Sequence, residues 1–173
     1  MALGLKGTRT VLERLEISLP KHILHVAGSN GKGTVCALMA TSLGLDGIEN
    51  VLFSSPHVVR LEERVRRIGI PLSNEEFDEA LLLIHDAACS QVHEFTVDLT
   101  FFEVTYLVAM IASQGCNVLI LETGLGGRLD ATRSGPATAS LVTSVTREHV
   151  DILGGDLPTI AREKAAIARP NCP

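Results

Sequence analysis

Aromatic side chains are scarce in this chain of 173 residues, which has no tryptophan, one tyrosine and five phenylalanines. Apolar residues still make up 46% of the sequence and charged residues 20%. This is the composition of a globular domain, and it excludes a disordered chain. The length suits a single domain. We therefore expect a core built mainly from leucine, isoleucine, valine and alanine.

The sequence also lacks a metal-binding or disulfide pattern of cysteines and any long apolar run. The four cysteines have no regular spacing, which favours free thiols in a reducing compartment: Cys36, Cys89, Cys116 and Cys172. The longest apolar stretch is far shorter than a membrane span, and no signal peptide opens the chain. We expect no membrane association and a cytoplasmic location, with a mitochondrial form left open. The net charge of −5 argues against a nucleic-acid partner, which binds a basic face.

Short apolar runs alternate with helical patterns along the chain. The runs at 23–27, 51–54, 117–121 and 139–144 are typical of buried strands, and a hairpin is expected over 63–72. Helical patterns lie at 12–16, 34–40, 74–89, 100–113 and 157–168. This order predicts an α/β fold, with a P-loop-type parallel sheet flanked by helices and right-handed crossovers.

Polar and glycine-rich clusters follow four of the predicted strands. Gly28 to Gly33 follows the first strand, Ser54-Ser55 the second and Glu122 the third, and His149 lies shortly after the fourth. Ligands of such sheets bind outside the carboxyl ends of the strands. We therefore expect the four clusters to converge on one edge of the sheet.

The glycine loop is the clearest of these clusters and has the sequence Gly28-Ser29-Asn30-Gly31-Lys32-Gly33-Thr34. Its glycines allow backbone N–H groups to turn toward phosphate oxygens, and Lys32 would reach the outer phosphates. The alternative is an ordinary strand-to-helix turn with an exposed lysine. The standard phosphate-loop pattern is not met, because it requires glycine at Val26 and serine or threonine at Gly33.

This loop, preceded by His25-Val26-Ala27, resembles the shortened phosphate loop of the Mur ligase superfamily. The glycine after Lys32 points to its folate branch, the dihydrofolate synthase and folylpolyglutamate synthase family. Further segments resemble that family in its own order from His22 to Pro173: Ser54-Ser55-Pro56-His57, Glu63-Arg64-Val65, Thr100-Phe101-Phe102-Glu103, the segment from Leu121 to Thr132, Glu148-His149, and the segment from Ile160 to Ile167.

The resemblance implies roles for individual residues. Residues 28–34 would bind ATP, with Lys32 acting on the phosphates. Ser55 and Glu122 resemble the hydroxyl and carboxylate ligands of a first Mg²⁺, oxygen donors of the kind this ion prefers. His149 resembles the ligand of a second Mg²⁺. Lys164 resembles the lysine that the family carbamylates to help hold that second metal, a modification that a sequence cannot show.

The resemblance also implies a reaction. A pterin-linked carboxylate attacks the γ-phosphate of ATP, and the amine of L-glutamate then displaces phosphate from the acyl phosphate to form an amide. The acceptor, dihydropteroate or folate, is left open, and the family suggests a monomer. Arg128 and Asp130 are expected to shape their loop, and His57, Glu63 and Arg64 to lie near the folate substrate.

The chain departs from the family pattern at Ala166, at Glu148 and by an extra residue at Gly154-Gly155. The whole of residues 1–173 is expected to be one N-terminal ATP-binding domain, truncated and without the C-terminal glutamate-binding domain, so that its own activity is weak. Two alternatives stay open. One is a non-catalytic nucleotide-binding fragment. The other is a Mur-type cell-wall ligase, against which Gly33 and the segment from Glu122 to Thr132 argue.

Overall fold

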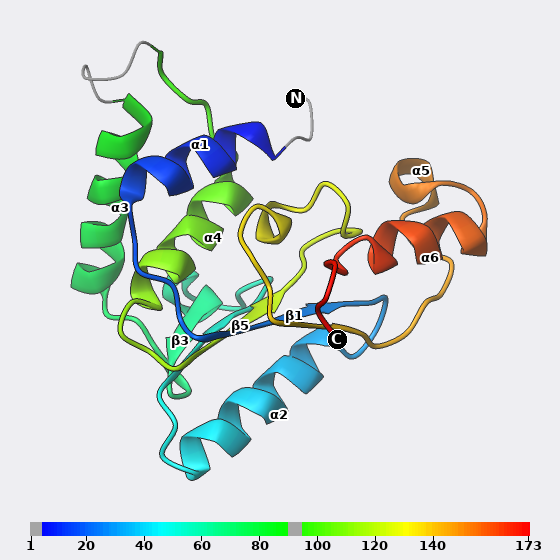
Figure 1. Cartoon of the computed structure of the whole chain (residues 1–173), viewed down its shortest axis with the longest axis horizontal. Coiled ribbons are helices and arrows are strands. Elements are labelled where there is room, and N and C mark those ends of the chain that lie inside the picture. Colours follow the sequence, from blue (N-terminus) through cyan, green and yellow to red (C-terminus); the bar gives the residue numbers. More distant parts are fainter. Residues whose placement is uncertain (1–4, 90–94) are drawn as a thin grey trace.

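The computed structural model describes residues 5–89 and 95–173, which form a six-stranded sheet with helices on both faces (Figure 1). The strands are β1 (His22–Ala27), β2 (Asn50–Phe53), β3 (Val65–Arg67), β4 (Ile70–Pro71), β5 (Val118–Glu122) and β6 (Ala139–Val142), in the spatial order β4-β3-β2-β5-β1-β6. Strands β2, β5, β1 and β6 are parallel, as predicted. The expected hairpin supplies β3 and β4, which pair antiparallel and make the sheet mixed.

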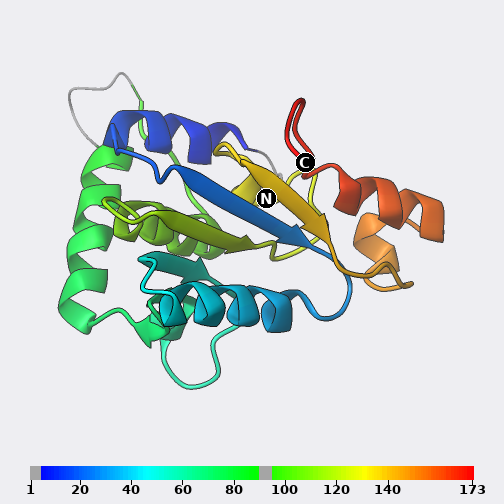
Figure 2. The same cartoon turned by 60° about the horizontal axis from the view of Figure 1, so that its bottom comes forward.

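The main helices lie on opposite faces of this sheet (Figure 2). Helix α2 (Lys32–Leu45) covers one face, and α1 (Lys6–Leu15), α3 (Asn74–Cys89) and α4 (Phe101–Ala112) cover the other. The short α5 (Val150–Leu153) and α6 (Leu157–Ala165) lie beyond the carboxyl ends of the strands. The α/β fold class predicted from the sequence is confirmed. In the described part of the chain, no helix is both long enough and apolar enough to cross a membrane.

The central strand β5 is buried on both faces, which explains its uninterrupted apolar sequence. Leu119 and Leu121 belong to the core beneath α4, whereas Val118 and Ile120 pack on the side of α2. The few aromatic residues are concentrated in the first of these cores. The ring of Phe53 lies 5.5 Å from that of Phe102 and 6.1 Å from that of Tyr106, centroid to centroid. The core is thus mainly aliphatic, as expected, with one aromatic cluster formed by Phe53, Phe102 and Tyr106.

Two helices begin with reciprocal side-chain caps. At the start of α3, the backbone N–H of Glu76 donates to Ser73 Oγ at 3.1 Å, and the N–H of Ser73 donates to Glu76 Oε2 at 3.0 Å. The sequence predicted this capping box from the serine and glutamate three residues apart. Thr100 and Glu103 form the same arrangement at the start of α4, so both helices begin where their sequences specify.

Replacing the capping serine should weaken the fold by a small, defined amount. We expect Ser73→Ala to lower the free energy of unfolding by about 1 kcal/mol, because one backbone N–H of α3 loses its partner. Urea unfolding measures this change. The exposed Ser18 makes no side-chain hydrogen bond with the described residues, and Ser18→Ala should change the free energy by less than about 0.5 kcal/mol. Equal effects of the two substitutions would contradict the capping role.

Candidate nucleotide and metal site

The glycine loop connects the end of β1 to the start of α2 and lies between the ends of β5 and β6. Gly31 has a φ of 82° and directly precedes the first residue of α2, Lys32, and among the described residues no side chain caps this helix. At Gly28 there is no room for a side chain. A Cβ atom there would lie 2.0 Å from Thr143 Oγ1. The loop therefore presents a helix N-terminus whose backbone N–H groups are available to an anion.

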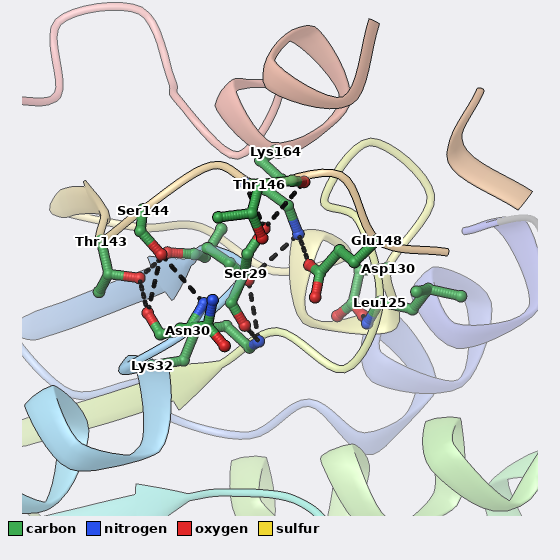
Figure 3. A network of polar contacts seen from close by, with 12 residues as sticks. Ser29, Asn30, Lys32, Leu125, Asp130, Thr143, Ser144, Thr146, Glu148 and Lys164 are labelled. Carbon is green, nitrogen blue, oxygen red and sulfur yellow. Dashed lines mark hydrogen bonds and ion pairs between the residues drawn. The ribbon is translucent and has the colours of Figure 1, made fainter. Parts of the chain in front are cut away.

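The segment that follows β6 holds this loop in place (Figure 3). The N–H of Ser29 donates to the carbonyl of Ser144 at 2.8 Å, and the N–H of Thr146 donates to Ser29 Oγ at 2.9 Å. Thr143 Oγ1 donates to the carbonyl of Asn30 at 2.7 Å. These contacts were not predicted, and the strand predicted over 139–144 ends at Val142. The polar run directly after a strand end was the signal available.

Two lysine ammonium groups donate to the same carbonyl in the loop. Lys32 Nζ donates to the carbonyl oxygens of Gly28 at 2.9 Å and Ser29 at 3.3 Å. Lys164 Nζ, from α6, donates to the carbonyl of Gly28 at 3.1 Å and to Glu148 Oε1 at 2.7 Å (Figure 3). Lys164 is 2% exposed. The structure thus brings together two of the predicted residues, Lys32 and Lys164, and adds Glu148 to them.

Glu148 is held as a carboxylate by this arrangement. Its partial burial acts in the opposite direction, but hydrogen bonds with Lys164 and Ser29 and the positive charge of Lys164 lower the pKa of Glu148 below its ordinary value. A buried ammonium group requires such a partner. Glu148 therefore offsets the charge of Lys164 and joins α6 to the loop.

Glu122 and Ser55, the predicted ligands of the first metal, are neighbours. The backbone N–H of Ser55 donates to Glu122 Oε2 at 3.2 Å. Gly33 lies beside this carboxylate: a Cβ atom there would be 3.4 Å from Glu122 Oε2, at van der Waals distance. Burial raises the pKa of Glu122, against the opposing effects of the Ser55 hydrogen bond and the charge of Lys32. Among the described residues no cation lies within ion-pair distance of Glu122.

A cavity of about 600 Å³ opens at this point. Lys32, Ser55 and Glu122 line it, and so do apolar side chains that include Phe102 and Leu125. The cavity therefore joins a polar group of predicted ligand residues to an apolar wall, the combination typical of a site for an organic ligand.

Asp130 and Arg128 shape the loop after β5, as expected. The Asp130 carboxylate accepts hydrogen bonds from the backbone N–H groups of Gly124 at 2.8 Å and Leu125 at 2.9 Å, and from that of Thr132 at 3.0 Å. Arg128 Nε donates to Glu163 Oε1 at 2.8 Å and so fixes this loop against α6. Both residues therefore hold the wall of the cavity in position.

His149 lies apart from the other predicted site residues. It is exposed, precedes α5 with a φ of 46°, and does not line the cavity. Its side chain makes no hydrogen bond with any residue in 5–89 or 95–173, and in those ranges no three His, Cys, Asp or Glu side chains gather as a metal site. The role of His149 as a metal ligand stays a prediction. Thr34 is exposed at the start of α2.

Comparison with known proteins gives a consistent result. The chain is 40% identical to the dihydrofolate synthase/folylpolyglutamate synthase of Haemophilus influenzae, with 99% of the chain and 38% of that protein covered. The identity to the Escherichia coli enzyme of the same name is also 40%, with coverages of 99% and 40%. No protein-family model matches.

Solved structures resemble it equally closely. Escherichia coli FolC in complex with DHPP and ADP superposes with a TM-score of 0.89 at 39% identity, covering 98% of this chain and 40% of that one. A bifunctional folylpolyglutamate synthase/dihydrofolate synthase with Mn, AMPPNP and L-glutamate bound gives 0.88 at 38% identity, with coverages of 98% and 41%. This chain is homologous to the dihydrofolate synthase/folylpolyglutamate synthase family. It spans about 40% of the length of the relatives described above.

The buried carboxylate of this dihydrofolate synthase/folylpolyglutamate synthase homologue should make folding depend on pH. Because burial raises the pKa of Glu122 above its ordinary value of 4.5, the native state favours the protonated form. The native chain then binds more protons than the unfolded chain between the two pKa values. The stability from this group is full below the unfolded pKa and is lost as the pH rises through the folded pKa.

We therefore expect Glu122→Gln to raise the free energy of unfolding of the metal-free chain at neutral pH. The gain should disappear below the ordinary glutamate pKa of 4.5, where Glu122 is protonated in both states. Urea unfolding of the parent chain and of Glu122→Gln, from about pH 4 to about pH 8, measures the difference in the free energy of unfolding. The exposed Glu79→Gln should show no such pH-dependent gain. A constant difference at every pH would contradict the argument.

Proposed function

We propose that this chain is the ATP- and metal-binding part of a ligase that joins L-glutamate to the carboxylate of dihydropteroate or folate through an acyl phosphate. The observation that carries the proposal is the common cavity of Lys32, Ser55 and Glu122, placed at the N-terminus of α2. A helix N-terminus and a lysine favour phosphate groups, and a serine hydroxyl with a carboxylate favours Mg²⁺.

Glu122 and Ser55 together are suited to bind a divalent cation. The carboxylate is 5% exposed, and only backbone N–H groups and the more distant Lys32 oppose the unfavourable effect of its burial. A bound Mg²⁺ would supply the missing positive charge, with Ser55 as the second protein ligand. Phosphate oxygens and water would complete its shell, because Mg²⁺ keeps several such ligands. When bound, the ion polarises the phosphoryl group that is transferred.

The remaining parts of the site would bind the transferred phosphoryl group and the acid substrate. Lys32 donates to two loop carbonyls, and the outer phosphates of a bound nucleotide would replace them as acceptors. The apolar wall at Phe102 and Leu125 suits a flat pterin ring. Both anions would then meet next to Ser55, where the loop N–H groups and Lys32 reduce their repulsion.

A second Mg²⁺ at His149 and carbamylation of Lys164 form a separate part of the proposal. Glu148 directly precedes His149 and already bonds to Lys164, so the two predicted residues share a neighbour. A carbamylated Lys164 would be anionic and would have to exchange this ion pair for a metal contact. Mass spectrometry of the intact chain, with and without bicarbonate, detects the modification directly.

The nucleotide site can be tested by calorimetry of ATP binding with and without Mg²⁺. We expect Lys32→Ala to weaken binding roughly 10-fold or more under both conditions, because it removes a charged contact to the phosphates. Glu122→Ala should weaken binding by a similar factor only when Mg²⁺ is present. Lys21→Ala is the matched control, since this exposed lysine precedes β1 at the opposite end of the strand.

The pattern of the two variants decides between interpretations. Equal effects of Glu122→Ala with and without Mg²⁺ would remove the metal role from this residue. A folded parent chain that binds no ATP would overturn the proposed nucleotide site and favour an inert fragment.

A further inference from the structure

Arg64 is a buried cation that lies at the end of a short 3₁₀ turn (Leu61–Arg64) directly before β3. The residue is 8% exposed. Its carbonyl accepts a hydrogen bond from the N–H of Ser54 at 2.9 Å, which places Arg64 beside the carboxyl end of β2 and next to Ser55. Within residues 5–89 and 95–173 no carboxylate lies within ion-pair distance of its guanidinium.

The contacts of this guanidinium orient it without neutralising its charge. Arg64 Nε donates to His57 Nδ1 at 2.9 Å. The guanidinium carbon lies 5.0 Å from the centroid of the Phe101 ring. Neither an imidazole nor a phenyl ring supplies a negative charge, and burial lowers the pKa of Arg64. A buried charge that lacks a counter-ion is unfavourable, so its presence calls for an explanation.

The carboxylates on the same segment are occupied elsewhere. Glu62 pairs with Arg60 at 3.2 Å. The two oxygens of Glu63 accept hydrogen bonds from the backbone N–H groups of Val58 and Arg60, among others. Neither carboxylate is directed at Arg64.

None of the carboxylates that line the cavity forms an ion pair with Arg64 either. Arg64 is part of the wall of the 600 Å³ cavity, together with four carboxylates, Glu103, Glu122, Asp130 and Glu163. Each has other partners. Glu103 accepts from Thr8 Oγ1 at 2.6 Å, Glu122 from the N–H of Ser55, Asp130 from loop N–H groups and Glu163 from Arg128. The guanidinium is therefore a buried cation of the cavity wall for which the described chain supplies no anion. Lys32, the other cation of this wall, donates to two loop carbonyls.

We propose that Arg64 binds the carboxylate of the acid substrate and that His57 is the residue that positions it. The inference rests on the function proposed above and names the group that recognises the acid. Because Nε is engaged by His57, the two Nη groups remain for a carboxylate, and paired N–H donors suit its two oxygens. This contact would hold the carboxylate beside Ser55, where the metal and the γ-phosphate are proposed to lie.

The contact also predicts selectivity for an acid over a neutral compound of the same shape. The apolar wall binds the ring system of either, whereas Arg64 gains a partner only from the acid. Arg64→Gln should therefore remove the preference for the acid and leave the binding of the neutral compound unchanged. His57→Phe should reduce the same preference, because Arg64 then loses the acceptor that fixes its orientation.

The test is calorimetry with two probes, dihydropteroate and the analogue in which hydrogen replaces its carboxylate, on the 173-residue chain. We expect Arg64→Gln to weaken dihydropteroate binding roughly 10- to 100-fold. Arg64→Lys should recover part of that loss, because it restores the charge without the paired donors. Arg66→Gln is the matched control. It removes the same charge from β3, its Nε donates to the carbonyl of Glu63, and it lies outside the cavity wall.

Each outcome has a separate meaning. Unchanged dihydropteroate binding by Arg64→Gln would overturn the role of Arg64 while the proposed function stands. An equal loss of both probes would also overturn it, since it would show a structural role in the pocket. A folded parent chain that binds neither probe would contradict the acid site of the proposed function itself.

Discussion

The hydrogen bonds on the carbonyl of Gly28 are the interaction on which the site depends. This oxygen accepts from Lys32 of α2 and from Lys164 of α6, so a single peptide group joins the glycine loop to a distant helix. Glycine is required there because a Cβ atom would overlap Thr143. The close approach of Thr143, directly after β6, thus depends on a residue without a side chain, and the carbonyl of the same residue makes the contact with α6.

The sequence predicted those parts of the fold that depend on local patterns. The glycine loop, the buried strand β5 and the capping serine of α3 each lie within a few consecutive residues, and each was placed correctly. The strand β6 was predicted too long, because Thr143 and Ser144 are compatible with an extended strand. Their side chains bond instead to Asn30, more than a hundred residues earlier in the chain, and no local pattern contains that information.

The same limit applies to the candidate site. The sequence could predict that Ser55 and Glu122 lie close together, because the carboxyl ends of parallel strands meet at one edge of a sheet. The contacts of Glu148 with Lys164 and of Arg64 with His57 depend on side-chain directions within loops. Resemblance to a family placed these residues near the site, but it did not indicate that one cation would be paired and the other left without an anion.

Two buried charges of opposite sign give the chemistry of the cavity a physical basis. Glu122 and Arg64 are both buried and have opposite signs, and both line the same cavity, yet among the described residues they form no ion pair. If they paired, each would satisfy the other and neither would attract a ligand. Kept apart, the carboxylate favours a cation and the guanidinium favours an anion. A ligand that binds only the native chain adds to its stability, so the proposed metal ion and acid would offset the cost of burying each charge alone.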